Sequence, residues 1–253
     1  MTLKYPVIRG IVTSPYMDVF AALLILVISL VKKFQYTFYF GGEVHFLTNV
    51  DEVQSAIFDG AYPLGIMSII GAVFSMLSTR LVGKQKNSGN LIGIATTINS
   101  GVNDYLFRNP SALLTYPITF IVHSIASYKW AKGQKIKKID KYYYYIVAIA
   151  MMVAFSLVFL GFYLFGEIEE NITFISIIAI SFGLSLGATV SNIFKYQETW
   201  LNWTIYNSFQ LIKNAMQLNL PNVVKYVFYL FNGTITWIDW KFNGDVESIK
   251  NIA

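Results

Sequence analysis

The sequence predicts an all-α integral membrane protein with about eight transmembrane helices. Apolar residues make up 55% of the 253 residues, and the mean hydropathy is +0.51. Only 13% of the residues are charged, whereas an ordinary soluble domain carries about 25%. The chain is long enough for about eight spans of ~20 residues each. Because it has no cysteine, disulfides and thiolate metal sites are excluded.

Eight apolar stretches carry this prediction. They cover approximately residues 15–35, 62–80, 88–107, 111–130, 143–166, 171–192, 196–215 and 221–241. Pro110 and Pro221 stand where the fourth and eighth helices would begin. Proline suits the first turn of a helix, where its missing N–H would have no partner in any case. The first stretch lacks a small-residue cleavage site, so we expect a retained helix.

The distribution of Lys and Arg predicts the orientation. The loop after the fourth stretch holds six lysines between residues 129 and 141, and the loop after the second holds Arg80, Lys84 and Lys86. The opposite loops are acidic, with Glu43, Asp51, Glu52, Asp59, Glu167, Glu169 and Glu170. Basic loops stay in the cytoplasm. We therefore expect a multi-pass membrane protein with both termini cytoplasmic, embedded in lipid and without nucleic-acid partners.

The chain also repeats itself. Residues 91–130 resemble residues 200–240: Asn99 and Ser100 correspond to Asn207 and Ser208, and Pro110 corresponds to Pro221. This similarity predicts two parallel three-helix units joined by one linking helix, with the substrate site between them near the midplane. The predicted divisions are 1–61 (N-terminal helix and outer loop), 62–130 (first unit), 131–170 (basic cytoplasmic loop and linking helix), 171–241 (second unit) and 242–253 (cytoplasmic tail).

The most informative stretch is WLNWTIYNSFQLIKN, residues 200–214. Spacings of 3, 4, 3 and 4 place five aromatic and amide side chains on one helical face, with Tyr206 beside it; they are Trp200, Trp203, Asn207, Gln210 and Asn214. Polar side chains facing lipid would have no partner, so this face should meet other helices or a water-filled cavity. Aromatic rings alternating with amides suit a flat, polar small molecule.

Similar stripes occur on two other predicted helices. Asn99 and Asn103 share a face of helix 88–107, and Tyr229 and Asn232 share a face of helix 221–241. Together with the preceding stripe, they form the candidate substrate-binding set. An alternative remains open, because Asn and Thr also hold membrane helices together through hydrogen bonds worth roughly 0.6–2 kcal/mol. Trp240, near the inner end of its helix, suits an interfacial aromatic belt.

Charged residues are expected only toward the ends of the stretches, including Asp104, Lys213 and Lys225. Ion-coupled carriers usually need an intramembrane carboxylate, so this placement favours uncoupled, facilitated transport. The sequence contains no P-loop motif and no catalytic cluster. We therefore expect neither an enzyme nor a catalytic residue, and no cofactor or metal.

At this point the residues suggest a family. The chain resembles the bacterial PnuC transporters over about residues 60–241, most strongly in WLNWTIYNSFQLIKN and in PNVVKYVFYLFNGTITWIDW, residues 221–240. The resemblance implies a SWEET-like 3+1+3 helix arrangement after an additional N-terminal helix, and a location in the inner (plasma) membrane of a bacterial cell. It also implies uptake of nicotinamide riboside by facilitated diffusion, with intracellular phosphorylation supplying NAD biosynthesis. The family's binding positions would fall either on Trp203 and Asn207 or on Tyr206, Gln210 and Asn214.

The chemistry of nicotinamide riboside agrees with this resemblance. Its cationic ring would stack on Trp203 or Tyr206, a contact worth about 2 kcal/mol when desolvated. With no cation expected at the midplane, the site suits a riboside better than a nucleotide. Two alternatives stay open: a carrier of thiamine or another vitamin, and a substrate-binding membrane subunit of an ATP-driven importer. The sequence does not decide whether the chain forms a homo-oligomer.

Overall fold

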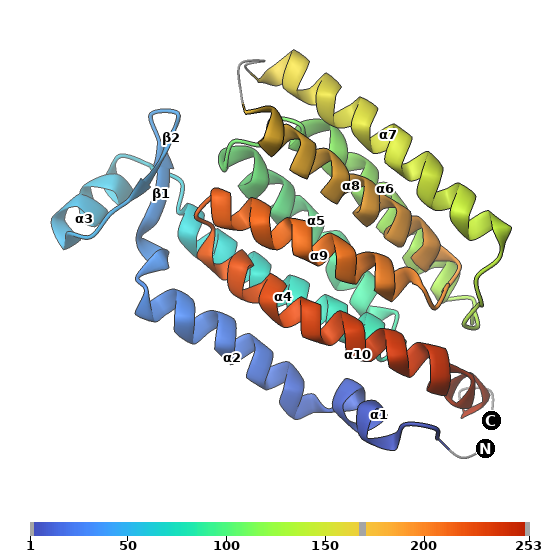
Figure 1. Cartoon of the computed structure of the whole chain (residues 1–253). Coiled ribbons are helices and arrows are strands. Elements are labelled where there is room, and N and C mark those ends of the chain that lie inside the picture. The colour runs from blue at the N-terminus through green and yellow to red at the C-terminus, as the bar shows by residue number, and fades with distance from the viewer. Residues whose placement is uncertain (1–2, 167–170, 251–253) are drawn as a thin grey trace.

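The computed structural model describes residues 3–166 and 171–250, and these residues form a helical bundle (Figure 1). The all-α class is confirmed. The described residues contain ten α-helices: α1 (Pro6–Thr13), α2 (Pro15–Val31), α3 (Val50–Phe58), α4 (Leu64–Gly83), α5 (Ser88–Leu106), α6 (Ala112–Trp130), α7 (Lys141–Phe165), α8 (Ile172–Ile193), α9 (Thr199–Met216) and α10 (Leu220–Lys250). A short 3₁₀ turn, η1 (Phe34–Tyr36), leads into the strands β1 (Thr37–Phe40) and β2 (Glu43–Phe46).

The predicted outer loop before residue 62 contains structure that the apolar stretches did not indicate. Strands β1 and β2 pair antiparallel, and helix α3 follows them. Gly41 and Gly42 both have positive φ, at 60° and 86°, as a tight two-residue hairpin turn requires. The signal was therefore a pair of glycines between two short aromatic and β-branched runs. The acidic residues Glu167, Glu169 and Glu170 lie outside the described residues.

Helices α4, α5 and α6 pack in chain order, as do α8, α9 and α10, while α7 packs on α8. In addition, α6 packs on α8 and α10 packs on α4, which closes the bundle. Figure 1 shows α4 and α8 running in the same direction, with α2 along the outside next to α10. Two parallel three-helix units would produce this cyclic packing, but the division into units remains a prediction. Helix α10 continues from Leu220 to Lys250, so it extends through most of the predicted cytoplasmic tail, residues 242–253.

Polar helix faces turn toward the centre of the bundle. By length and composition, α4, α7 and α8 could each cross a membrane, as could α1 and α2 taken together across their 55° bend. Helix α9 buries Asn207 and Gln210, whereas its Ile205 and Ile212 are exposed on the opposite face. Since lipid supplies no hydrogen-bond partners, such a helix has to place its amides against other helices or a cavity.

Arg80 is not a loop charge, which corrects the sequence interpretation. Its side chain is 1% exposed in α4. The guanidinium donates to Asp18 at 2.7 Å, to Asn232 Oδ1 at 2.8 Å and to the carbonyl oxygen of Val12 at 2.9 Å. Lys84 also pairs with Asp18. Arg80 therefore satisfies carbonyl groups left unpaired where α1 ends before α2, and holds this bend against α4 and α10.

Both ends of the described chain lie on one side of the bundle (Figure 1). Asn243 Oδ1 accepts from the backbone N–H groups of Lys4 and Tyr5, at 3.0 and 3.2 Å, and Arg9 pairs with Asp239. The basic loop 131–140 lies at the same end, since Ile136 packs beside the tryptophans there. The cytoplasmic assignment of this end remains a prediction, which now depends on the lysines between 129 and 141.

Asp140 anchors the end of this basic loop. Its carboxylate caps α7 by accepting from the N–H of Tyr142 at 3.0 Å. Hydrogen bonds from Lys137 and Tyr196 lower the pKa of Asp140 from 3.8 to about 2. Because its pKa is depressed in the folded protein, the carboxylate stabilises the fold above pH 4, and this contribution is lost as the pH falls toward 2.

Close packing of α4 against α5 depends on Gly89. A Cβ atom at this position would lie 2.6 Å from the carbonyl oxygen of Ser78 and 2.6 Å from the backbone nitrogen of Val82. We predict that Gly89→Ala lowers the melting temperature of the detergent-solubilised protein, because overpacking costs about 1–3 kcal/mol. Gly10→Ala is the matched control, since nothing lies within 4 Å of its added Cβ. Equal melting of Gly89→Ala and wild type would refute the tight contact.

Candidate functional site

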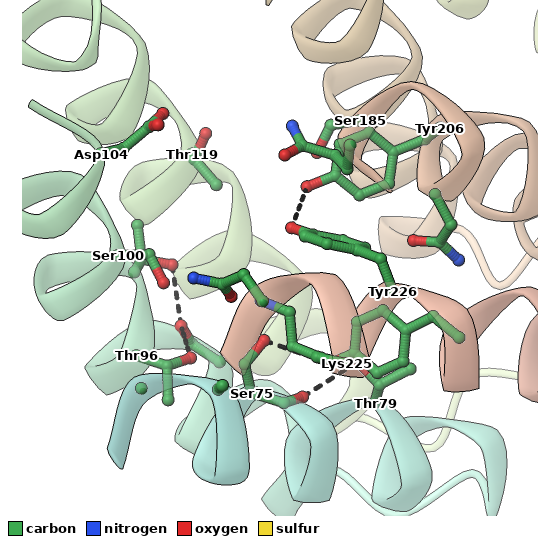
Figure 2. A pocket seen from close by; sticks show the side chains of 18 of the residues that line it. Ser75, Thr79, Thr96, Ser100, Asp104, Thr119, Ser185, Tyr206, Lys225 and Tyr226 are labelled. Carbon is green, nitrogen blue, oxygen red and sulfur yellow. Dashed lines mark hydrogen bonds between the residues drawn. The ribbon is translucent and has the colours of Figure 1, made fainter. Parts of the chain in front are cut away.

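A polar cavity lies inside the bundle, lined by residues of α4, α5, α6, α8, α9 and α10 (Figure 2). It brings together eight of the nine predicted site residues: Asn99, Asn103, Trp203, Tyr206, Asn207, Gln210, Asn214 and Tyr229. Asn232 is the exception. It does not line this cavity, and its Oδ1 accepts from Arg80, so the structure places it in the clamp around the bend between α1 and α2.

The amides of α9 form one wall of the cavity. Asn214 Nδ2 donates to Gln210 Oε1 at 3.1 Å and to the backbone oxygen of Gln210 at 2.8 Å. Asn207, one turn earlier, is only 4% exposed, yet no hydrogen bond to its carboxamide is found within the described part of the chain. The amides of both registers suggested by the sequence thus lie on the same wall, and Asn207 keeps its hydrogen-bonding capacity for the cavity.

Aromatic side chains form the adjoining wall. The ring of Trp203 meets Trp200 edge-on, with centroids 5.0 Å apart. The hydroxyls of Tyr206 and Tyr226 lie 3.1 Å apart, which connects α9 to α10 and is drawn in Figure 2. Tyr229 continues this row, with its ring centroid 5.6 Å from that of Tyr226. This wall offers flat aromatic faces, and hydrogen bonds at the hydroxyls fix the positions of the tyrosine rings.

Tryptophans close the cavity toward the end that carries the termini. Trp200 is fully buried, and its ring centroid lies 5.7 Å from that of Trp240. Trp240 Nε1 donates to the carbonyl oxygen of Gly83 at 2.9 Å. Trp240 is only 1% exposed, so it does not belong to an interfacial belt, and that interpretation was wrong. The indole N–H of Trp240 finds a partner inside the protein because the last residue of α4 packs against α10 at this position.

Charged side chains lie toward helix ends as expected, but some of them also line the cavity, which the sequence interpretation did not foresee. Lys213 Nζ donates to Asp104 Oδ1 at 2.8 Å, and both side chains are at least nine-tenths buried. Lys225 of α10 also lines the cavity and is 4% exposed. The signal was present in the sequence: Lys213 follows Gln210 by three residues, and Lys225 precedes Tyr229 by four, which is the spacing of one helical face.

Asp104 connects three helices. Besides Lys213, its carboxylate accepts from Asn109 Nδ2 at 2.6 Å, from Gln217 Nε2 at 3.1 Å and from the Tyr116 hydroxyl at 3.3 Å. These partners come from α6, α9 and the loops beside them. Asp104 is therefore a structural centre of the site, and its oxygens are already occupied. His123 also lines this cavity. Among the described residues, however, no group of three or more His, Cys, Asp or Glu side chains could hold a metal ion.

A family model described as "Nicotinamide mononucleotide transporter" matches residues 65–242, well over half of the chain. The chain belongs to this transporter family. Its matched segment begins in α4 and ends in α10, so it includes every helix that lines the cavity. Membership of a transporter family agrees with the expectation that the protein is not an enzyme.

Two individual relatives agree with membership of the nicotinamide mononucleotide transporter family. The "Nicotinamide riboside transporter PnuC" of Neisseria mucosa (strain ATCC 25996 / DSM 4631 / NCTC 10774 / M26) is 25% identical over 224 residues, covering 79% of this chain and 82% of that protein. The "Crystal structure of the Vitamin B3 transporter PnuC" superposes with a TM-score of 0.63 at 18% identity, covering 95% of this chain and 94% of that one. The fold is therefore that of a PnuC transporter, and the protein is a multi-pass membrane protein.

The ion pair between Asp104 and Lys213 generates a stability prediction. Asp104→Asn leaves Lys213 buried without a counter-charge, which costs about 3–5 kcal/mol for such pairs. We predict a clearly lower melting temperature in detergent for this variant, and partial recovery in the double variant Asp104→Asn/Lys213→Met. If the double variant melts no higher than the single one, the two side chains are not coupled as the structure indicates.

Proposed function

We propose that this protein takes up a vitamin B3 nucleoside, with nicotinamide riboside as the reference substrate. The observation that carries the proposal is Asn207. Its carboxamide is buried, lines the cavity beside Trp203 and has no hydrogen-bond partner among the described residues. The fully buried polar atoms without a partner do not include this amide, so its atoms reach the cavity, where a ligand could bind them. The Neisseria relative, named for nicotinamide riboside, supports the same substrate.

The walls of the cavity suit the parts of such a nucleoside. The pyridine ring would lie on Trp203, where an aromatic face attracts a cation. The carboxamide would pair with the carboxamide of Asn207, since each supplies one donor and one acceptor pair. The ribose hydroxyls would face Gln210 and Asn214. These contacts form the proposed substrate site, to which Tyr206, Tyr229, Asn99 and Asn103 contribute the remaining walls.

We also propose that transport is facilitated diffusion. The absence of intramembrane charge no longer supports this, because Asp104, Lys213 and Lys225 line the cavity. A different observation does. The carboxylate of Asp104 is the acidic group among the described lining residues, and four hydrogen-bond donors occupy it, which leaves it poorly available to a coupled cation. Phosphorylation inside the cell would then retain the vitamin for NAD synthesis, with both termini of the protein on the cytoplasmic side.

Transport without an energy source is the direct test. We predict that proteoliposomes containing the purified protein accumulate labelled nicotinamide riboside to the external concentration, with no ATP and no ion gradient. Unlabelled riboside added outside should accelerate the exit of label from preloaded vesicles. A requirement for a sodium or proton gradient would refute facilitated diffusion, and a requirement for an ATPase partner would favour the importer-subunit alternative.

Asn207→Leu tests the ligand role of this amide. The substitution keeps the side-chain volume but removes the donor and acceptor, so we predict a loss of riboside affinity of about tenfold or more, as expected for removing hydrogen bonds worth about 1–3 kcal/mol. Calorimetry on the purified variant is the measurement. Ser208→Leu is the control, because Ser208 is exposed on the opposite face of α9. Wild-type affinity in Asn207→Leu would assign the amide to packing.

A further inference from the structure

Residues 129–141, at the end of the bundle that carries both termini, form an exposed basic surface. This segment contains six lysines and one acidic residue, Asp140, and all six lysines are exposed. The carboxylate of Asp140 already pairs with Lys137 at 2.7 Å and accepts from the hydroxyl of Tyr196 at 2.7 Å. The other five lysines have no ion-pair partner among the described side chains, so the basic surface keeps its positive charge; they are Lys129, Lys132, Lys135, Lys138 and Lys141.

Hydrogen bonds hold the backbone of this loop in place. The N–H of Lys137 donates to the carbonyl oxygen of Lys195 at 2.9 Å, and the N–H of Gln197 donates to the carbonyl oxygen of Lys137 at 3.0 Å. The loop between α6 and α7 is thereby tied to the connection between α8 and α9. The ammonium of Lys132 lies 4.2 Å from the ring centroid of Tyr128, in a cation–π contact. The fold therefore presents these lysines on a defined surface.

The basic surface borders two rows of exposed apolar side chains. Each row keeps to one helical face, because its members are three or four residues apart. On α6 the row leads up to Lys132 and consists of Ile121, Ile125 and Tyr128. On α7, which forms one edge of the bundle (Figure 1), the row starts after Lys141 and consists of Tyr145, Ile149 and Met152. The lysines thus lie at the end of both lipid-facing rows, with tyrosines between, as at a membrane–water boundary.

A ligand that fits both parts of this region is an amphiphile with an anionic head group and acyl chains. Its phosphate would accept charge-assisted hydrogen bonds from the lysines, and its acyl chains would lie along the apolar rows. A soluble anion or an acidic protein segment would use the lysines alone. Lysine clusters beside membrane helices attract anionic lipids electrostatically.

We propose that residues 128–145 bind an anionic phospholipid at the membrane surface. This inference goes beyond the proposed function and does not depend on it. A ligand that binds only the folded state stabilises that state. Because the loop joins α6 and α7 to the connection between α8 and α9, a lipid bound there should stabilise the whole bundle against heat.

The test is the melting temperature of the purified full chain in a neutral detergent, with added dioleoylphosphatidylglycerol or dioleoylphosphatidylcholine. The two lipids share their acyl chains and differ in head-group charge. We expect phosphatidylglycerol to raise the melting temperature by about 2–4 °C more than phosphatidylcholine does, the shift that a small gain in stability produces in a chain of about this size. High salt should reduce the difference, because it screens exposed charges. Glycerol phosphate, the soluble head group alone, should not reproduce it.

Two double variants locate the binding surface. In Lys132→Gln/Lys138→Gln, the difference between the two lipids should fall by half or more. The matched control is Lys32→Gln/Lys33→Gln, which removes the same charge from two exposed lysines where α2 ends beside the hairpin; it should keep the wild-type difference. Each variant is compared with itself in the two lipids, so a change in its own stability does not affect the result.

Three results would overturn the inference. Equal melting in the two lipids means that head-group charge is not recognised. A difference that persists in Lys132→Gln/Lys138→Gln, or that falls as much in the control, means that another surface or the total charge is responsible. A full shift with glycerol phosphate means that the surface binds a soluble anion. In each case the proposed function remains intact, because the measurement involves no transported substrate.

Discussion

The arrangement of this bundle depends on one constraint: the hydrocarbon core of the membrane offers no hydrogen-bond partners to polar groups. Each polar side chain on a membrane helix has to find its partner inside the protein. Helices α5, α9 and α10 therefore turn their amides and hydroxyls inward and leave residues such as Ile98, Ile205 and Val227 exposed. The centre of the molecule is polar as a result. Where the inward faces do not pair all of one another's hydrogen-bonding groups, a cavity remains, and the proposed substrate site lies in this cavity.

Two ionic centres hold the walls of that cavity in place. Arg80 joins α2, α4 and α10 through Asp18 and Asn232, and Asp104 joins α5 to α9 through Lys213. The charged groups Arg80, Asp104 and Lys213 are paired within the protein, so these centres act as structure. Asn207 differs, because its amide lies at the cavity without a hydrogen-bond partner among the described residues. The contrast separates groups that hold helices from groups that are available to a ligand.

The amphipathic stripe on α9 was predictable from the sequence, because residues three and four apart share a helical face whatever the rest of the fold does. The repeat and the resemblance to PnuC transporters led to the same helices. What sequence reasoning missed depends on tertiary packing. Lys213 lies in the last turn of α9, and only the packing of α5 shows that it meets Asp104 at the cavity. Asn232 has the spacing of a site residue, but Arg80 of α4 binds it instead. Hydropathy windows likewise had no means of finding the hairpin at Gly41 and Gly42.

The central claim is that the cavity between the helices is a pyridine-nucleoside site. The most direct measurement is competition binding to the detergent-purified wild-type protein, in which nicotinamide riboside, thiamine and riboflavin each compete with a labelled pyridine nucleoside while tryptophan fluorescence reports on Trp203 and its neighbours. The account predicts that the riboside displaces the label and quenches the fluorescence, whereas the other two vitamins do neither. Displacement by thiamine without binding of any pyridine nucleoside would keep the fold but contradict the proposed substrate.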